Sequence, residues 1–265
     1  MDPVKVAVHG ALGKMGREVL NALSRDPNIE PVGAVSRRAV EDYLSLPDGS
    51  GLIPLSADLE EIITRTRPQV VVDFSNTKAA TKAIRAASAA GINVVTGTTG
   101  LSEATLKEAE ALAEEHDVGI IVASNFALGA VFLLHMARQA ARYFDYADIT
   151  EMHHEAKVDA PSGTALALAK AMAEGKGGPF TAPSPEKETL KGTRGGQHQG
   201  ITIHSRRMPG LMAHHEIVFG AQGQTLTFRH DTINRECYMP GVIMAVEEVV
   251  KFKGLIVGLE NVLEL

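Results

Sequence analysis

A run of residues near the middle of the chain, from Glu151 to Thr164, combines side chains that transfer protons with groups that bind anions. It contains the adjacent histidines His153 and His154 and, a little further on, Lys157. Histidine is the side chain best suited to proton transfer near neutral pH, and a lysine ammonium group attracts carboxylates. The run therefore predicts acid–base chemistry on an anionic substrate.

The same run ends in residues that are typical of the start of a helix. Pro161 and Ser162 favour the first turn of a helix that we expect over 165–174. Gly163 and Thr164 would then present backbone N–H groups that have no partner inside the helix. Because such a helix start binds carboxylates, we expect it to act together with the nearby lysine.

A metal site and a purely structural role are the alternatives for these histidines. Neighbouring side chains of a strand point to opposite faces, so His153 and His154 would chelate a metal poorly. The sequence has a single cysteine and no i, i+4 histidine pair of the kind that binds zinc. We therefore expect no metal. A structural role suits a second pair better, His214 and His215, because these lie within a predicted strand over 213–219.

A glycine-rich run follows the first predicted strand, 4–8, and opens a predicted helix, 16–23. Its glycines stand at 10, 13 and 16, the spacing G-x-x-G-x-x-G. Glycine permits a tight turn and lets backbone N–H groups approach a pyrophosphate, and the helix start adds partial positive charge. The run predicts a dinucleotide site. The alternative is an ordinary connection between a strand and a helix.

The residues after the second predicted strand bear on the choice of cofactor. A site that prefers NAD usually has a carboxylate here for the ribose 2′-hydroxyl. This sequence instead has Ser36, Arg37 and Arg38. An arginine can pair with a 2′-phosphate through two hydrogen bonds, so we predict a preference for NADPH over NADH. The alternative is that both arginines are solvated surface charges.

Two further loops, 96–100 and 123–126, follow the next predicted strands of the same sheet. Ligands of open α/β sheets bind outside the carboxyl ends of the strands. We therefore expect both loops to converge with the glycine run on one crevice, where their small and hydroxyl residues suit ribose and nicotinamide.

The first half of the chain alternates short apolar runs with helical spacing, which predicts an α/β fold with a Rossmann-like, doubly wound parallel sheet over residues 1 to about 124. Ser102 is the expected N-cap of its last helix. The predicted strands are 4–8, 32–35, 70–72, 92–95 and 119–122, and the predicted helices are 16–23, 58–66, 78–90 and 103–116.

The rest of the chain predicts a second, α+β domain with a mixed, mostly antiparallel sheet. Its expected strands are 146–153, 201–206, 215–219 and 226–230. The stretch 175–200 lacks periodicity and is interpreted as a long surface loop. Helical spacing returns over 241–251, and we expect this helix to pack back on the first domain. The predicted domains are 1–126 with 235–265 for dinucleotide binding and 127–234 for substrate binding and oligomerisation.

Composition excludes several classes of protein. With 45% hydrophobic and 22% charged residues, the 265-residue chain has the balance of a globular protein. A net charge of -6 argues against a nucleic-acid partner. The lone cysteine, Cys237, suits a reducing compartment. The apolar runs are too short to span a bilayer, and the start of the chain leaves no room for a signal peptide. We expect a cytoplasmic protein.

The run from Glu151 to Ala165 resembles the signature of the dihydrodipicolinate reductases. It reads Glu-x-His-His-x-x-Lys-x-Asp-Ala-Pro-Ser-Gly-Thr-Ala. The similarity extends over nearly the whole chain and includes the opening glycine run, 73–75, 97–100, 124–126, Arg207, Gly210, His215, Phe219, His230 and Gly241.

The resemblance implies a reaction and a set of roles. NAD(P)H would reduce the cyclic product of pyruvate and aspartate semialdehyde, with loss of water, to tetrahydrodipicolinate in the lysine pathway. His153 would be the proton donor or acceptor and Lys157 a second proton donor. The residues that would bind the substrate's two carboxylates are His154, Lys157, Gly163 and Thr164. Those that would contact the cofactor are Gly10, Ala11, Leu12, Gly13, Lys14, Met15, Arg37, Gly97, Thr98, Thr99, Ala123, Ser124, Asn125 and Phe126.

One departure from the family supports the cofactor prediction. Many members carry an acidic residue where Ser36 stands, and its absence favours NADPH, with NADH as the lesser alternative. The second predicted sheet resembles the family's tetramerisation surface, which implies a homotetramer.

Two rival functions belong to other classes. An aldehyde dehydrogenase of the aspartate-semialdehyde type needs a cysteine nucleophile, and Cys237 is the one candidate, far in sequence from the histidine run. A dinucleotide-sensing regulator would bind NADPH without turnover, which leaves the histidines and lysine of that run unexplained.

Overall fold

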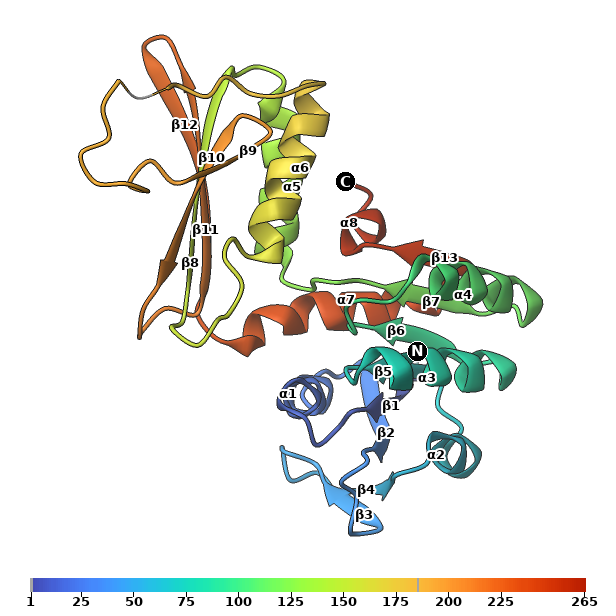
Figure 1. The fold of residues 1–265 in the computed structure, drawn as a ribbon. Helices are drawn as coiled ribbons and strands as arrows, with labels where there is room; N and C mark the ends of the chain where they lie inside the picture. Colours follow the sequence, from blue (N-terminus) through green and yellow to red (C-terminus); the bar gives the residue numbers. More distant parts are fainter. Residues whose placement is uncertain (1, 185) are drawn as a thin grey trace. The chain divides into compact units, whose positions relative to one another are not determined.

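A computed structural model describes residues 2–184 and 186–265 (Figure 1). The chain divides into two compact units, Met1–Leu128 with Arg235–Leu265, and Gly129–Asn234. The sequence analysis drew the first boundary two residues earlier, at 126, and the second at the same place. In the described part of the chain, no helix has both the length and the apolar character that a membrane span requires.

The first unit contains an eight-stranded sheet in the order β13-β7-β6-β5-β1-β2-β4-β3. All its pairs are parallel except the one between β3 and β4. This agrees with the expected doubly wound sheet. Its strands are β1 (Val4–His9), β2 (Ile29–Val35), β3 (Tyr43–Ser45), β4 (Leu52–Ser56), β5 (Val70–Asp73), β6 (Asn93–Thr96), β7 (Gly119–Val122) and β13 (Gly254–Val257).

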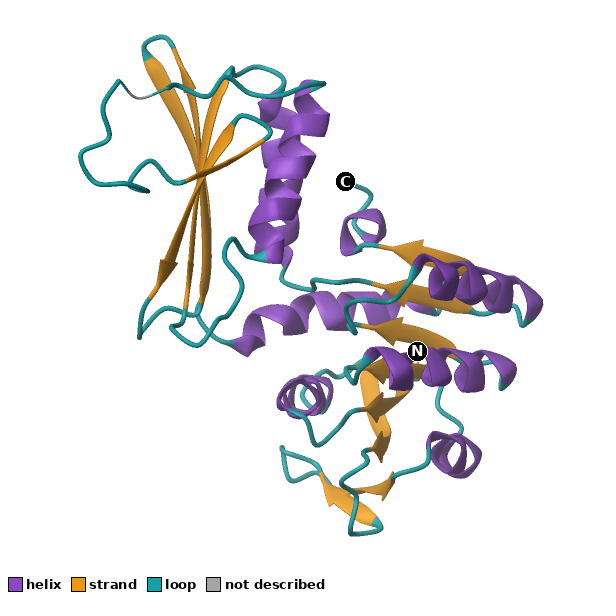
Figure 2. Cartoon of the chain, viewed as in Figure 1, coloured by secondary structure: helices purple, strands orange, loops and turns teal. Residues whose placement is uncertain are grey.

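Helices cover both faces of this sheet, which is why its central strands are apolar on both sides (Figure 2). Helices α2, α3 and α4 contact one another in turn, and α1 contacts α7. Side chains cap three helix starts: Asp58 for α2, Asn76 for α3 and, as expected, Ser102 for α4. The helices are α1 (Lys14–Leu23), α2 (Leu59–Thr66), α3 (Thr77–Ala89), α4 (Glu103–Glu115), α7 (Met239–Val249) and the short α8 (Leu259–Val262).

Residues 235–265 return to the first unit, as the helical spacing over 241–251 led us to expect. Helix α7 contacts α1 and the strands β5, β6 and β7. Its apolar side chains Val242, Val246 and Val249 are buried. Gly241 allows close packing, because a Cβ there would lie 2.2 Å from the carbonyl oxygen of Phe126.

The second unit is a five-stranded sheet in the order β12-β11-β8-β10-β9. Strands β8 and β10 are parallel and the other pairs are antiparallel, so the sheet is mixed and mostly antiparallel, as expected. Its elements are α5 (Leu128–Ala141), β8 (Tyr146–His153), α6 (Gly163–Lys176), β9 (Gly196–His198), β10 (Ile201–Arg207), β11 (Ala213–Ala221) and β12 (Gln224–Thr232).

Helices α5 and α6 cover one face of this second sheet. Alternate strand residues such as Ile149, Ile217 and Phe219 point into a core that Leu168 and Met172 of α6 complete. The residues between them lie on the other face. They include Glu216 of β11 and Arg229 of β12, whose side chains lie 3.2 Å apart. The row of core-facing residues on β8 continues beyond Ile149, and its last residues form part of the candidate functional site.

Several elements were missed by the sequence analysis. Helix α5 is apolar around most of its circumference, so it lacks the polar face that marks an amphipathic helix. Strands β3, β4 and β13 are short. The stretch 175–200 was wrongly interpreted as loop throughout, because α6 extends to Lys176 and β9 covers Gly196–His198. Phe180 anchors the connection by burying its ring in the core of the second unit.

Candidate functional site

The glycine run forms a tight turn between β1 and α1. Gly10 has a φ of +87°, and a Cβ there would lie 2.5 Å from the carbonyl oxygen of Phe74. A Cβ on Gly16 would lie 2.2 Å from the carbonyl oxygen of Gly10. Gly13 is the N-cap of α1 and has no side chain to satisfy the first N–H groups of that helix. The turn therefore has the close-packed backbone and the helix start that suit a pyrophosphate.

A cavity of about 380 Å³ joins the glycine run to the loop after β6. Met15, Gly97, Thr98 and Thr99 are among the residues that line it. The Thr98 hydroxyl donates to Oδ2 of Asp73 at 2.7 Å and accepts from the Ser75 amide at 3.2 Å. This side chain therefore holds the loop in place, and the amides of Gly97 and Thr98 are also bonded within the fold, to the Asp73 carbonyl and to Thr96 Oγ1.

Asp73 is the buried centre of a polar cluster at the end of β5. Its carboxylate accepts hydrogen bonds from the hydroxyls of Ser75 and Thr96 as well as Thr98, and His9 Nδ1 lies 2.8 Å away. Burial alone would raise the pKa of Asp73, but these partners outweigh burial and lower the pKa. An ionised carboxylate therefore ties the ends of β1, β5 and β6 together.

The loop after β7 lies next to the loop after β6. The Ala123 amide donates to the Thr96 carbonyl at 3.0 Å, and the Asn125 side chain accepts from the Ala127 amide at 2.9 Å. The Phe126 ring is buried, with its centroid 5.6 Å from that of Phe74. Ser124 is exposed. The loops after β1, β6 and β7 thus gather at the carboxyl edge of one sheet, as the sequence analysis predicted.

The two arginines after β2 have different surroundings. Arg37 lines a cavity of about 620 Å³ that also contains His9 and Asn76. Arg38 instead donates a hydrogen bond to the carbonyl of Leu12 in the glycine turn. The buried Ser36 accepts from the Arg38 amide at 3.2 Å. Of the two, Arg37 is therefore the one placed to meet a ligand in this cavity.

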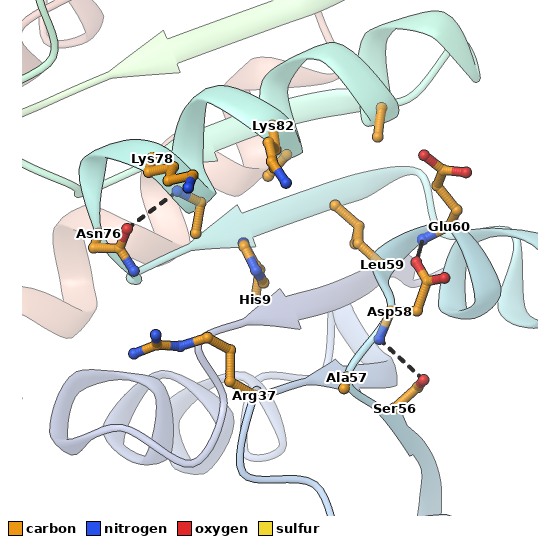
Figure 3. Close-up of a pocket in the computed structure, with 13 residues that line it drawn as sticks. His9, Arg37, Ser56, Ala57, Asp58, Leu59, Glu60, Asn76, Lys78 and Lys82 are labelled. Atoms are coloured by element: carbon orange, nitrogen blue, oxygen red, sulfur yellow. Dashed lines mark hydrogen bonds between the residues drawn. The ribbon is translucent and has the colours of Figure 1, made fainter.

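Two lysines that the sequence analysis did not single out line the same cavity. Lys78 and Lys82 come from α3, whereas Arg37 comes from the end of β2, and Figure 3 shows them on opposite sides of the pocket. Their i, i+4 spacing after the Asn76 N-cap was the available signal. The acids Asp58 and Glu60 also line this cavity, and the Asp58 side chain accepts a hydrogen bond from the Glu60 amide as the cap of α2. The cavity therefore carries three cationic groups beside these two acids.

The histidine run lies in the second unit, where Glu151 and His153 extend the core-facing row of β8. Both side chains are buried, and His153 Nδ1 lies 2.5 Å from Oε2 of Glu151. Arg207 of β10 donates two hydrogen bonds to the same carboxylate, at 2.7 and 3.0 Å. Burial lowers the pKa of His153, and the neighbouring Glu151 carboxylate partly opposes this.

His215 of β11, for which the sequence analysis expected a structural role, packs against this cluster. It pairs with Glu151 across the β11–β8 ladder, and its ring centroid lies 5.5 Å from that of His153. Its Nε2 lies 3.2 Å from Oγ of Ser162, the N-cap of α6. Burial lowers the pKa of His215 to about 4, so this ring is neutral at physiological pH.

Lys157 and the start of α6 both contact one carboxylate of the chain. Lys157 Nζ donates to Asp159 Oδ1 at 2.7 Å. Hydrogen bonds from Lys157 and from the amide of Asp159 itself, with a smaller contribution from the Gly163 amide, lower the pKa of Asp159. Thr164 occupies the next position of the helix, and His154 is exposed on the loop. The run thus brings an ammonium group and a helix start together around a carboxylate of the chain, and their binding of a substrate carboxylate stays a prediction.

The sequence analysis gave Arg207 no role beyond its place in the family pattern, and it gave His215 only a structural one. Each stands on a different strand from Glu151, and nothing local to either residue marks it as part of a site. Within the described residues, no group of three histidine, cysteine or acidic side chains could hold a metal ion.

Comparisons with known proteins cover the whole chain. Residues 4–126 match the family model described as dihydrodipicolinate reductase, N-terminus, and residues 129–263 match the one described as dihydrodipicolinate reductase, C-terminus. The 4-hydroxy-tetrahydrodipicolinate reductase of Dehalococcoides mccartyi is 52% identical over 265 residues, 100% of both chains. That of Moorella thermoacetica is 46% identical over 264 residues, 98% of both.

Solved structures give the same result. A dipicolinate-bound dihydrodipicolinate reductase from Paenisporosarcina sp. TG-14 superposes with a TM-score of 0.89 at 39% identity, over 98% of this chain and 99% of that one. An amine dehydrogenase from Mycobacterium smegmatis, at 15% identity and a TM-score of 0.65 over 96% and 94% of the two chains, shares the fold.

Proposed function

This chain belongs to the dihydrodipicolinate reductase family, and from that premise we propose that it reduces 4-hydroxy-tetrahydrodipicolinate to tetrahydrodipicolinate, with NADPH as the preferred reductant. The observation that carries the proposal is the full-length match to reductases at 52% identity. This reaction serves lysine and diaminopimelate biosynthesis. It consumes one hydride and one proton and releases one water.

The first unit, 1–126 with 235–265 in the sequence-based division, is proposed to bind the pyridine nucleotide. The close-packed turn at Gly10, where a Cβ would overlap the Phe74 carbonyl, supports this assignment. The dinucleotide would contact the turn and the loops after β2, β6 and β7 through Gly10, Ala11, Leu12, Gly13, Lys14, Met15, Arg37, Gly97, Thr98, Thr99, Ala123, Ser124, Asn125 and Phe126. When bound, the reduced nicotinamide supplies the hydride.

The preference for NADPH is supported by the charges around the larger cavity. Arg37, Lys78 and Lys82 line it, and Ser36 stands where an acid would favour the 2′-hydroxyl of NADH. A guanidinium pairs well with a phosphate dianion. We propose that Arg37 binds the 2′-phosphate, with the two lysines adding longer-range attraction.

The second unit, 127–234 in the same division, is proposed to bind the substrate. His153 would transfer the proton that reduction requires, and Lys157 would bind a carboxylate and act as a second proton donor. His154, Gly163 and Thr164 would bind the substrate's carboxylates together with Lys157. The carboxylate of Asp159, which contacts both Lys157 and the Gly163 amide, supports the carboxylate-binding part of this proposal.

We further propose a cytoplasmic homotetramer, assembled through the face of the second sheet that α5 and α6 leave uncovered. That face presents complementary charges, among them Arg229 and Glu216 on neighbouring strands. Light scattering coupled to size-exclusion chromatography measures the mass directly. A monomer at micromolar concentration would refute the tetramer.

The activity is tested by generating the substrate from pyruvate and aspartate semialdehyde with the preceding synthase and following the oxidation of NADPH and NADH. We expect turnover with both cofactors and a higher kcat/KM with NADPH. No turnover with either cofactor would refute the proposed reductase activity. Equal kcat/KM values would refute the preference alone. Turnover that survives thiol alkylation of Cys237 would exclude the aldehyde dehydrogenase alternative. Turnover of any kind would exclude a regulator that binds NADPH without reacting.

A further inference from the structure

Glu151 is a carboxylate without exposed surface at the centre of the His153 cluster. Its position follows from the strand, since the residues that precede it in the same row, Ala147 and Ile149, face the apolar core. A lone carboxylate would be strongly disfavoured at such a place. Its partners therefore decide what this residue does.

Both oxygens of Glu151 accept hydrogen bonds from other elements of the second unit. Oε1 accepts from Arg207 Nη2 at 2.7 Å and from the Ser162 amide at 3.3 Å. Oε2 accepts from Arg207 Nη1 at 3.0 Å and lies 2.5 Å from His153 Nδ1. Burial would raise the pKa of Glu151, but the hydrogen bonds from Arg207 and from its other partners lower it. The carboxylate is therefore ionised.

An ionised carboxylate can only accept hydrogen bonds. The hydrogen between the two residues must therefore be on Nδ1 of His153, which assigns the tautomer of the neutral ring. Nε2 is then the nitrogen that gains and loses a proton. The same carboxylate stabilises the imidazolium cation that carries this proton, as acidic partners of catalytic histidines do in general.

The charged and titratable groups around His153 come from four elements. Glu151 on β8 favours the imidazolium, whereas Arg207 on β10 and Lys157 on the following loop oppose it. His215 on β11 is neutral near pH 7 and adds no charge. Glu151 is thus the anion in direct contact with the ring. Arg207 limits the effect of this anion because it donates hydrogen bonds to the same carboxylate.

We propose that Glu151 is a positioning residue, held by Arg207, that directs proton transfer to Nε2 of His153 and sets how readily that nitrogen is protonated. The inference rests on the proposed role of His153 as the proton donor in reduction. Neither the comparisons nor the sequence motif assigns a task to Glu151 or Arg207.

The test compares full-length Glu151→Gln and Arg207→Gln enzymes with wild type. The pH dependence of kcat/KM with NADPH is measured, together with an NMR titration of the His153 ring. If the protonated ring donates, activity falls as pH rises through the pKa of His153. Removing the anion should move this falling limb of the pH profile to lower pH by about one unit. At a fixed pH above the limb, kcat/KM should then be about tenfold lower than in wild type. Removing the opposing cation should move the limb to higher pH.

Glu155→Gln, the same change at an exposed position of the neighbouring loop, is the matched control and should leave the limb in place. Shifts of opposite sign in the two variants support the inference, and either variant that folds reports its own sign. A uniform loss of kcat at every pH, with an unchanged His153 titration, overturns it. An inactive wild-type enzyme would instead refute the proposed function, so the two failures are distinguishable.

Discussion

The ammonium nitrogen of Lys157 lies 2.7 Å from a carboxylate oxygen of Asp159. The lysine side chain is mostly buried, with 22% of it exposed, whereas that of Asp159 is 56% exposed. Because Asp159 is largely exposed to solvent, this pair contributes little to stability, about 0–1 kcal/mol. We therefore expect that a substrate carboxylate bound by Lys157 and the first amides of α6 would replace Asp159 at small cost.

Lys157→Ala should damage both substrate affinity and turnover while leaving cofactor binding near normal. A hydrogen bond to a charged group contributes about 1.5–3 kcal/mol, so kcat/KM should fall by about ten- to a hundredfold or more. Steady-state kinetics measures the loss, and fluorescence titration of NADPH measures Kd for the cofactor. Lys170→Ala, at an exposed lysine of α6, is the matched control. Unchanged kinetics in Lys157→Ala would exclude the proposed role.

His153→Gln should lower turnover far more than cofactor affinity. General acid catalysis contributes about 10²- to 10⁴-fold, and glutamine retains much of the shape of the ring without its titratable nitrogen. Single-turnover kinetics under saturating NADPH isolates the chemical step. His198→Gln changes an exposed histidine of β9 and should have no effect. A variant of His153 that keeps the wild-type rate would show that the proton comes from elsewhere.

The parts of the fold and site that could be predicted from the sequence are those that depend on neighbours in the chain. The glycines at 10, 13 and 16 and the cap at Ser162 involve residues within a few positions of one another, and local spacing reveals them. The parallel sheet was equally readable, because strands buried on both faces have unbroken apolar runs.

The cluster around Glu151 could not be predicted in the same way. It depends on strand register, which places His215 opposite Glu151 and Arg207 opposite His153. Residues more than fifty positions apart meet only after three strands pair. Likewise, Arg37 and Arg38 are equivalent in the sequence, and only the folded turn shows that Arg38 contacts the Leu12 carbonyl.

Arg37→Ala should weaken NADPH binding by about ten- to a hundredfold, because it removes a charged hydrogen-bonding partner of the proposed 2′-phosphate. NADH lacks this phosphate, so its Kd should change little. Arg38→Ala is an informative comparison, since its guanidinium holds the glycine turn and its loss should affect both cofactors alike. Isothermal titration of each variant with each cofactor measures the four Kd values, which are compared with those of wild type. Equal losses for NADPH and NADH in Arg37→Ala would show that the 2′-phosphate is not bound there.

Acid should destabilise the protein in part through His215. Burial lowers the pKa of His215 from 6.5 to about 4, so the folded state resists protonation that the unfolded chain accepts. The resulting contribution to stability is complete above pH 6.5 and is lost as pH falls toward 4, up to about 3 kcal/mol. Urea unfolding of wild type and His215→Gln across this range isolates the contribution, since glutamine does not titrate and other acidic or histidine groups are common to both. The free energy of unfolding of the variant should fall less steeply between pH 6.5 and 4, and parallel curves would mean that the buried ring is not resisting protonation.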